Sequence, residues 1–272
     1  MVPLTPRYIM QAMTEHTDLL RSLHVPGSPL VLPNAWDVAT AKAVEAAGFP
    51  VVATTSGGVA EALGYQDHHG APADEMLAQA ARIVRGVDVP VTVDAEAGYG
   101  MEPAELVAAL REVGAAGCNL EDTDHAKGEL RDRKQHAEWL RAVRQAADAD
   151  GYGLVINARV DVWVGPYLSG STAPQADLVD EALGRAHAYA EAGADCVYPI
   201  ALGERDAIAA FIERSPAPVN LMALPKGLPL AELTELGAAR VSYAAFLYRE
   251  AMQQFGTRLA EISAQVSQGP SR

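Results

Sequence analysis

Short apolar segments rich in β-branched residues alternate with alanine-rich amphipathic segments along the whole chain. This alternation is typical of parallel strand–helix units, because sandwiches and helical bundles each lack one of the two periods. Every strand candidate is followed by a helical pattern, so the units repeat from end to end. The predicted strands cover residues 30–35, 51–56, 89–96, 117–122, 154–161, 196–200, 218–223 and 239–243.

Several predicted helices end in a glycine just before the next strand, as in AAGFPVV at 46–52 and EAGADCV at 191–197. A glycine in the left-handed conformation stops a helix at such a point. Eight parallel strands with buried faces favour a closed barrel, so we predict an α/β fold of the (β/α)8 TIM barrel type, with a doubly wound sheet as the alternative. No linker divides the chain, and we expect one domain over 1–272, an extra N-terminal helix at 5–24 and a disordered tail at 266–272.

Composition narrows the class of partner. The formal net charge is −14, and the basic clusters that bind phosphate groups are absent. No run of about 18 apolar residues occurs, and the N-terminus lacks the pattern of a leader peptide. We therefore expect a soluble, cytoplasmic protein that acts on a small molecule and binds neither nucleic acid nor membrane. Cys118 and Cys196 lie in apolar segments and are predicted to be buried free thiols.

Acidic residues gather where the predicted strands end. Asp94 and Glu96 close the third strand, Glu121 and Asp122 close the fourth, and Asp161 closes the fifth. In (β/α)8 barrels the active residues lie at this end of the strands. Converging carboxylates repel one another unless they share a cation, so the cluster predicts a hard metal such as Mg²⁺. Capping of the next helix explains any single acid equally well, above all Asp122 and Asp161.

Two further features point to an anionic ligand. Ser56, Gly57 and Gly58 follow the second strand, where glycines let backbone N–H groups approach a ligand, although they also form ordinary tight turns. Arg159 ends an otherwise apolar strand, and a buried guanidinium needs an anionic partner. That partner is either a substrate carboxylate or a neighbouring acid.

The charged segment 124–136 follows the fourth predicted strand and has the character of a mobile lid, or of a solvated surface loop. Lys127 within it is either a catalytic ammonium or a solvated lysine. His68, His69 and His125 lie near the same rim, and none has a metal-ligand partner at helical spacing. We predict these three histidines to be surface residues.

Four motifs occur in order along nearly the whole chain: Ser56-Gly57-Gly58 with Leu63-Gly64-x-x-Asp67, Asp94-x-Glu96-x-Gly98-Tyr99-Gly100, Glu121-Asp122, and Ala158-Arg159-x-Asp161. Their order and spacing resemble the isocitrate lyase and phosphoenolpyruvate mutase superfamily. The resemblance implies a barrel enzyme that stabilises an enolate when a C–C or P–C bond breaks. It also implies Mg²⁺, with Mn²⁺ as an alternative, held directly or through water by Asp67, Asp94, Glu96 and Glu121.

The same resemblance assigns the remaining site residues. Arg159 and the backbone of Ser56 and Gly57 would anchor a substrate carboxylate. Lys127 would lie on a gating loop. The predicted substrate contacts also include Gly58 and Asn220, and the predicted catalytic residues are Lys127, Glu129 and Arg159.

The chain also departs from the family pattern. The lyases carry Lys-x-Cys-Gly-His on the gating loop, whereas this chain reads Lys127-Gly128-Glu129-Leu130-Arg131, without the acidic cysteine. Either Glu129, desolvated by a closed lid, or Lys127 or a bound water would then move the proton. Ile200 stands where tricarboxylate lyases have glutamate, which indicates a smaller or less polar substrate. Glu96 replaces an aspartate and Val160 a threonine, and we expect neither change to abolish metal binding.

Three functions remain open on this basis. The leading hypothesis is a Mg²⁺-dependent lyase that cleaves a C–C bond of a small 2-oxo or 2-hydroxy dicarboxylic acid. The second is P–C chemistry of the phosphoenolpyruvate mutase or phosphonopyruvate hydrolase type, and the third is a non-catalytic 2-oxo acid binding protein. A homo-oligomer, dimer or tetramer, is expected from the resemblance. The apolar helix near Phe246–Phe255 would either pack on a neighbouring subunit or complete the barrel by itself.

Overall fold

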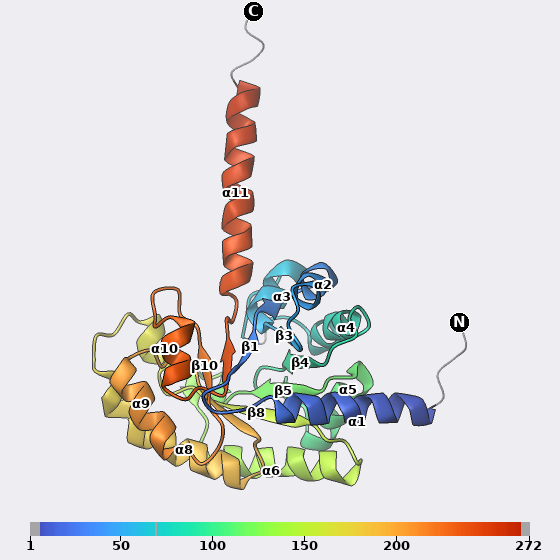
Figure 1. Cartoon of the computed structure of the whole chain (residues 1–272), viewed down its shortest axis with the longest axis vertical. Coiled ribbons are helices and arrows are strands. Elements are labelled where there is room, and N and C mark those ends of the chain that lie inside the picture. The colour runs from blue at the N-terminus through green and yellow to red at the C-terminus, as the bar shows by residue number, and fades with distance from the viewer. Residues whose placement is uncertain (1–5, 69, 268–272) are drawn as a thin grey trace, which may run out of the picture.

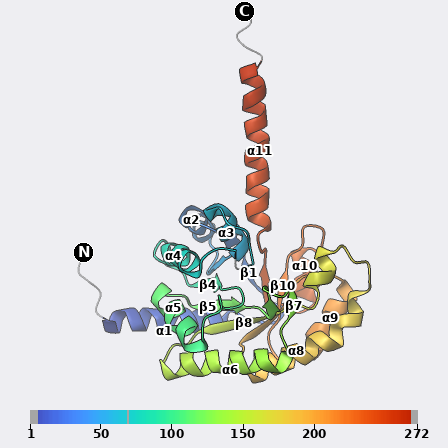
Figure 2. The same ribbon diagram turned by 180° about the vertical axis from the view of Figure 1, so that it is seen from behind.

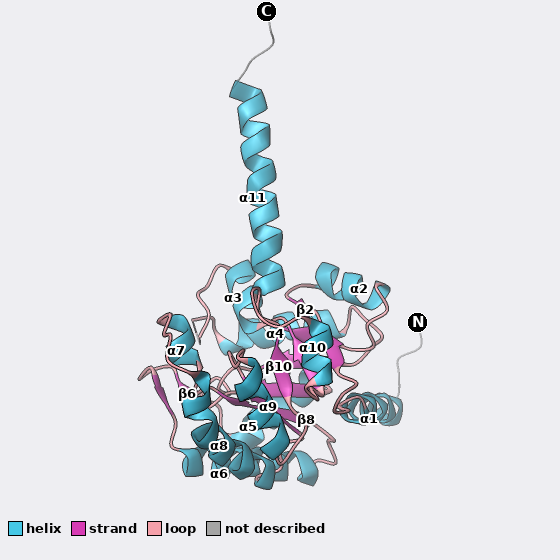
Figure 3. Cartoon of the chain, turned by 60° about the vertical axis from the view of Figure 1, so that its left-hand side comes forward, coloured by secondary structure: helices cyan, strands magenta, loops and turns pink. Residues whose placement is uncertain are grey.

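The computed structural model describes residues 6–68 and 70–267, and its parallel strands are surrounded by helices, as Figure 3 shows. The eight predicted strands are all present, the first of them split in two at Pro33. Their bounds are β1 (Leu30–Leu32), β2 (Asn34–Ala35), β3 (Val52–Thr54), β4 (Val91–Asp94), β5 (Gly117–Leu120), β8 (Val155–Val160), β9 (Cys196–Pro199), β10 (Asn220–Met222) and β11 (Arg240–Ser242).

The strand pairings run around a ring. Six strands pair in parallel in the order β2-β3-β4-β5-β8-β9, and three more in the order β1-β11-β10. Pro33 separates β1 from β2, and a proline cannot donate to a strand ladder. On the other side, a parallel bridge between Val197 and Val219 links β9 to the residue before β10. These two joints connect the sheets into the order expected of a (β/α)8 barrel, and the predicted fold class is confirmed.

Helices cover the outside of the strands (Figures 1 and 2). Most follow a strand and return the chain to the start of the next one, which is the right arrangement for parallel pairing. Residues 51–56 were predicted as a strand throughout, but the strand stops at Thr54 and a helix begins at Ser56. The helices are α1 (Pro6–Ser22), α2 (Val38–Ala46), α3 (Ser56–Leu63), α4 (Ala73–Val84), α5 (Pro103–Val113), α6 (Arg133–Ala149), α7 (Val164–Leu168), η1 (Gln175–Leu178), α8 (Val179–Glu191), α9 (Arg205–Arg214), α10 (Leu230–Glu235) and α11 (Phe246–Ser267).

The predicted N-terminal helix is α1, and it covers the end of the barrel away from the acidic residues. Leu20 is fully buried against a small apolar cluster that includes Leu32 and Val155. A side chain at Gly117 would meet Leu20 and the backbone of Val155 at less than 3 Å, so only glycine allows this close approach. Arg21 also donates to Asp195 at 2.9 Å. The helix therefore closes the amino-terminal end of the barrel and leaves the carboxyl end open.

The last helix, α11, packs on the barrel only through its first turn, where Tyr248 contacts Trp36 and Phe246 packs against the core. It projects from the molecule as a single rod (Figure 1), and Tyr248 is its buried residue. A self-contained eighth barrel helix, one of the two readings of the sequence, is therefore wrong. The helix extends to Ser267, so the first two residues of the expected tail are helical, while residues 268–272 lie outside the described part of the chain. None of the described helices combines the length and apolar character needed to cross a bilayer.

Candidate active site

A cavity of about 150 Å³ opens at the carboxyl ends of the strands. Its polar lining comes from strand ends, and one side is apolar. This location is the one that the barrel rule predicts. The cavity is lined by Asn34, Thr55, Ser56, Asp67, His68, Asp94, Asn119, Arg159, Val164, Tyr167, Leu168, Tyr198, Ile200, Ala201, Met222, Ser242, Ala244, Ala245, Phe246 and Arg249.

Asp94 is the last residue of β4, and its carboxylate is held from two sides. Oδ2 accepts the backbone N–H of Ser56 at 3.0 Å, and Oδ1 accepts the side-chain amide of Asn119 at 3.4 Å. Ser56 is the first residue of α3, so its N–H belongs to the partially positive end of that helix. Both oxygens therefore keep a fixed orientation toward the cavity.

The glycines after β3 serve close packing. A side chain at Gly57 would lie 2.7 Å from Oδ2 of Asp67, and one at Gly58 would lie 2.7 Å from the Thr55 methyl group. The missing Cβ at Gly57 thus lets Asp67 reach the cavity. Ser56, Gly57 and Gly58 were all predicted to contact substrate. Of these, only Ser56 lines the cavity, and its N–H donates to Asp94.

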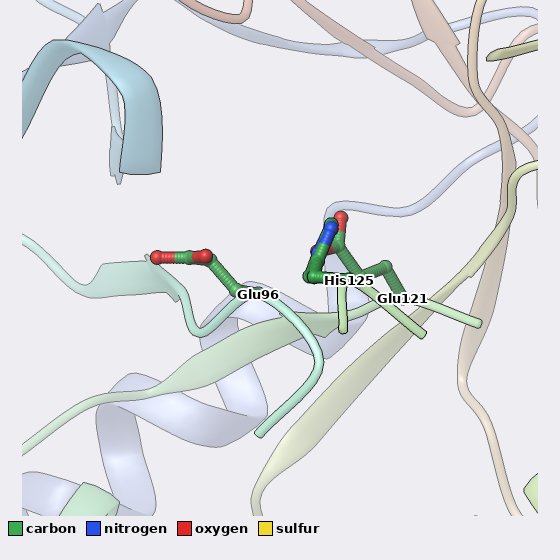
Figure 4. Close-up of side chains that lie close together, drawn as sticks. All are labelled: Glu96, Glu121 and His125. Atoms are coloured by element: carbon green, nitrogen blue, oxygen red, sulfur yellow. The ribbon is translucent and has the colours of Figure 1, made fainter. Parts of the chain in front are cut away.

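Glu96, Glu121 and His125 form a compact cluster beside the cavity (Figure 4). One ligand atom from each of them lies within 4.8 Å of the other two. Glu96 and Glu121 are almost fully buried. The backbone of Glu96 has a φ of +47°, in the left-handed region that a residue with a side chain adopts at a cost of about 1–3 kcal/mol. Such strain concentrates at functional sites, where it aims a side chain.

Glu121 lies between two basic groups. Its Oε2 contacts Nη1 of Arg159, and its Oε1 contacts Nε2 of His125. Burial raises the pKa of Glu121, and the charge of Arg159 and the hydrogen bond from His125 oppose that rise. Burial lowers the pKa of His125, but the hydrogen bond and charge of Glu121 outweigh it, and the net direction is upward. The prediction that His125 is a surface residue is therefore wrong.

Neighbouring acidic side chains fix Arg159 in place. Its Nε and Nη2 donate to the two carboxylate oxygens of Asp161, each at 3.0 Å. The backbone N–H of Asp161 in turn donates to Asp122 at 2.9 Å, and Tyr189 donates to Asp122 at 2.6 Å. Burial and the charge of Asp161 raise the pKa of Asp122 to about 6. Asp122 and Asp161 thus orient the guanidinium, whereas capping was the simpler reading of both residues.

The predicted lid residues lie away from the cavity. The segment after β5 folds into a hairpin of β6 (Thr123–Asp124) and β7 (Glu129–Leu130). Lys127 is 72% exposed and its Nζ lies 3.0 Å from Oδ2 of Asp124. Lys127 and Glu129 line a separate surface groove beside Trp139.

Of the other residues named from the sequence, some line the cavity and others do not. Asn220 is fully buried behind the cavity and lies 3.4 Å from the hydroxyl of Ser242, which does line it. His68 lines the cavity, and its ring lies 5.0 Å from that of His125. His69 lies outside the described residues. Sequence reasoning missed several lining residues that carry no motif: Asn34, Asn119, Tyr198, Ser242 and Arg249.

The donor set at this mouth fits a divalent metal. Asp67 and Asp94 line the cavity, and Glu96 and Glu121 belong to the adjoining cluster. Carboxylate oxygens are the ligands that hard divalent cations prefer. Four carboxylates near one guanidinium leave an excess of negative charge that a cation would neutralise. These residues could therefore hold such an ion.

Comparison with known proteins decides the family. The family model described as phosphoenolpyruvate phosphomutase matches residues 20–263, which is most of the chain. The chain belongs to the phosphoenolpyruvate mutase family. This match confirms the resemblance that the four motifs predicted, and several of the relatives and structural neighbours are named as lyases or mutases.

The similarity to three other proteins extends over most of the chain. An uncharacterized protein of Mycobacterium tuberculosis is 37% identical over 235 residues, covering 84% of each chain. "Probable 2-methylisocitrate lyase 2" of Corynebacterium glutamicum is 32% identical over 260 residues, covering 93% of this chain and 82% of that one. A crystal structure titled "putative phosphonomutase" from Burkholderia cenocepacia J2315 is 42% identical, has a TM-score of 0.85, and covers 90% of this chain and 99% of that one.

Proposed function

We propose that this protein is a Mg²⁺-dependent lyase that cleaves a C–C bond of a small 2-oxo or 2-hydroxy dicarboxylic acid, by a retro-aldol or Claisen type of cleavage or by decarboxylation, through an enolate. The observation that carries the proposal is the arrangement of the cavity lining. Asp94, Arg159 and a second guanidinium, that of Arg249, line the cavity together with several apolar side chains. A small acid with two carboxylates matches this distribution of charge.

Asp67, Asp94, Glu96 and Glu121 would hold the metal, with Mn²⁺ as an alternative to Mg²⁺. When bound, the metal would polarise the substrate's 2-oxygen and stabilise the negative charge that develops there as the bond breaks. Asn119 and the N–H of Ser56 keep the Asp94 carboxylate directed at this position. Their contribution is to fix the ligand before substrate arrives, which reduces the reorganisation needed during the reaction.

Arg159 would bind the carboxylate next to the 2-oxygen. Three of its five N–H groups are engaged by Asp161 and Glu121, which leaves the others for substrate. Because Asp161 holds the guanidinium plane by two parallel hydrogen bonds, the bound carboxylate is oriented as well as attracted. Arg249, exposed at the base of α11, would bind the second carboxylate.

The apolar part of the lining separates this proposal from the alternatives. The cavity lining includes the apolar side chains of Val164, Leu168, Ile200 and Met222, and we propose that they contact the departing part of the substrate. A phosphonate group carries more charge than a carboxylate and would need more donors there. P–C chemistry is the second candidate, supported by the structure titled "putative phosphonomutase". The relatives named "Probable 2-methylisocitrate lyase 2" and "2-methylisocitrate lyase" support the first.

Lys127 and Glu129 enter this scheme as part of a moving element. We propose that the hairpin of β6 and β7 folds toward the cavity when substrate binds, and that Lys127 or Glu129 then handles the proton. In the conformation described here both side chains face solvent. Their role therefore depends on the opening of the contact between Lys127 and Asp124.

The surface of α11 supports the expected oligomer. Met252, Phe255, Leu259, Ile262 and Val266, here named the apolar stripe of α11, recur at alternating intervals of three and four residues and are all exposed. This spacing is typical of a helix that packs on another helix. We propose a homo-oligomer, dimer or tetramer, in which a neighbouring subunit covers the stripe.

A substrate panel tests the proposed reaction. The purified protein with Mg²⁺ is incubated with oxaloacetate, 2-methylisocitrate, 2,3-dimethylmalate and phosphonopyruvate, and pyruvate and phosphate release are followed. We expect a 2-oxo acid from one dicarboxylate and at least a hundredfold loss in Asp94→Asn, as for removal of a group that acts on the transition state. Phosphate release from phosphonopyruvate alone would favour P–C chemistry. Oxalate binding without any turnover would favour the binding protein.

A further inference from the structure

We propose that His125 is a direct nitrogen ligand of the metal, so that the ion is held by carboxylate oxygens together with one imidazole. The inference rests on the proposed function only in assuming that a divalent metal binds at this mouth. His125 follows Glu121 by four residues, and its Nε2 contacts Oε1 of that glutamate. With Glu96 the two form a set of three potential metal ligands whose ligand atoms all lie within 4.8 Å of one another.

The hairpin holds His125 toward the site. The carbonyl of Asp124 accepts the backbone N–H groups of Lys127 and Gly128 at 3.2 and 2.8 Å, and its side chain accepts that of Ala126 at 3.1 Å. This tight turn sends Lys127 outward, where it is 72% exposed, while His125 turns inward and is only 12% exposed. The inward residue of the loop is therefore the histidine.

The charges around His125 favour a cation between it and the two glutamates. Glu96, Glu121, Asp94 and Asp161 surround the site, and Arg159 supplies one positive charge to them. The excess negative charge can be neutralised in two ways. Either His125 is protonated and is itself the cation, or neutral imidazole coordinates a metal through Nε2. The ring of His68 lies 5.0 Å from that of His125 between ring centres and is tilted against it by 34°, which limits the orientations open to the His125 ring.

A nitrogen ligand changes which metal the site prefers. Mg²⁺ takes oxygen ligands and keeps several waters, so it gains little from an imidazole. First-row divalent metals bind sites that include nitrogen with an affinity that rises from Mn²⁺ toward Cu²⁺, and Mn²⁺, the weakest of them, still gains more from an imidazole than Mg²⁺ does. The chain should therefore prefer Mn²⁺ over Mg²⁺ by a larger factor than the same site without His125.

The test uses the full chain loaded with Mn²⁺, studied by pulsed electron paramagnetic resonance for coupling to ¹⁴N and by titration for affinity. We expect nitrogen coupling in the wild type and in the matched control His68→Asn, and its loss in His125→Asn. Mn²⁺ affinity should fall at least tenfold in His125→Asn, the lower end of the loss seen when a metal site's supporting residues are removed. Mg²⁺ affinity should change less, so the preference for Mn²⁺ shrinks.

The outcomes separate this inference from the proposed function. Mn²⁺ that binds the wild type without nitrogen coupling, and is lost in Asp94→Asn, would overturn the role of His125 and leave the metal site standing. Coupling that persists in His125→Asn would overturn it as well. Absence of any Mn²⁺ or Mg²⁺ binding by the wild type would overturn both. Thermal unfolding of each variant shows whether a loss of binding comes from a loss of fold, and His125→Gln provides a second variant if His125→Asn is unstable.

Discussion

Arg240 donates to the side-chain oxygen of Asn119 at 3.2 Å, deep inside the barrel. Asn157 donates to the same oxygen at 2.8 Å. With two donors on its oxygen, the Asn119 amide is fixed in one orientation, and its NH₂ group faces Asp94. The buried guanidinium of Arg240, which forms no salt bridge with a carboxylate of residues 6–68 or 70–267, thus acts on the proposed metal site through an amide.

We expect Asn119→Leu to lower both stability and metal affinity. The change leaves the Arg240 donor without its acceptor, which costs about 1–3 kcal/mol in the free energy of unfolding. It also frees the Asp94 carboxylate to rotate, so Mn²⁺ binding should weaken severalfold. Urea unfolding and metal titration measure the two effects. Asn157→Leu is the comparison, because it removes only one of the two donors to the Asn119 oxygen and leaves the Asn119 amide beside Asp94. Its loss of metal affinity should be smaller, and an equal loss would contradict the role given to Asn119.

Lys127→Gln should lower kcat by about a hundredfold or more if Lys127 moves a proton, which is the usual size of a general acid–base contribution. Asp124→Asn removes the resting partner of Lys127 without removing the ammonium, so its kcat should stay near the wild-type value. Steady-state kinetics on the substrate found by the panel compares the two. Equal losses in both variants would show that the contact only stabilises the hairpin.

Introducing charge into the apolar stripe of α11 should dissociate the oligomer. The double substitution Phe255→Glu and Leu259→Glu places two carboxylates where apolar side chains would meet a neighbour. Light scattering after size-exclusion chromatography should show a monomer. Gln253 lies on the opposite face of the helix, and Gln253→Glu should keep the wild-type mass. A monomeric wild type would contradict the proposal directly.

Acid should destabilise the fold through His136. This side chain is buried between Trp139 and Tyr189, and burial lowers its pKa from 6.5 to about 3. As the pH falls from 6.5 toward 3, His136 takes up a proton in the unfolded chain but not in the folded one. The stability that the neutral His136 side chain contributes is therefore fully present above pH 6.5 and is lost as the pH falls toward 3. When the pH is lowered from 7 to 5, the free energy of unfolding should fall by about 2 kcal/mol less in His136→Phe than in the wild type.

Urea unfolding at both pH values measures this difference. His24 is buried as well, with a pKa lowered to about 4 by burial and by Arg240, so part of the acid sensitivity should remain in His136→Phe. His187 is exposed, and His187→Gln should keep the full wild-type loss. If the free energy of unfolding fell by the same amount in His136→Phe as in the wild type, His136 would not contribute to the acid sensitivity.

Much of the fold could be predicted because its signals are local. Each strand candidate is a short apolar run, and each helix that ends in glycine carries its own stop signal, as at Gly114 and Gly193. Asp94, Glu96, Glu121 and Arg159 could be placed at one mouth because parallel strands bring their carboxyl ends together. These predictions needed only residue order and the period of the pattern.

The loop after β5 could not be predicted in the same way. Lys127 and Glu129 were expected at the site and His125 at the surface, whereas the hairpin turns the histidine inward and the other two outward. Which way a loop side chain points depends on backbone hydrogen bonds within the turn, here those accepted by Asp124, and no periodic pattern encodes them.

The sequence by itself determined the strand–helix alternation, the barrel, the ring of acids at its mouth and the family, because these depend on local apolar pattern and on the order of motifs. Only the tertiary structure decided that Asn119 and Arg240 support Asp94, that His125 joins Glu96 and Glu121, and that α11 leaves the barrel. The contacts of Asn119 and His125 form between side chains on different strands and loops, and the path of α11 depends on packing, so none of these follows from local sequence.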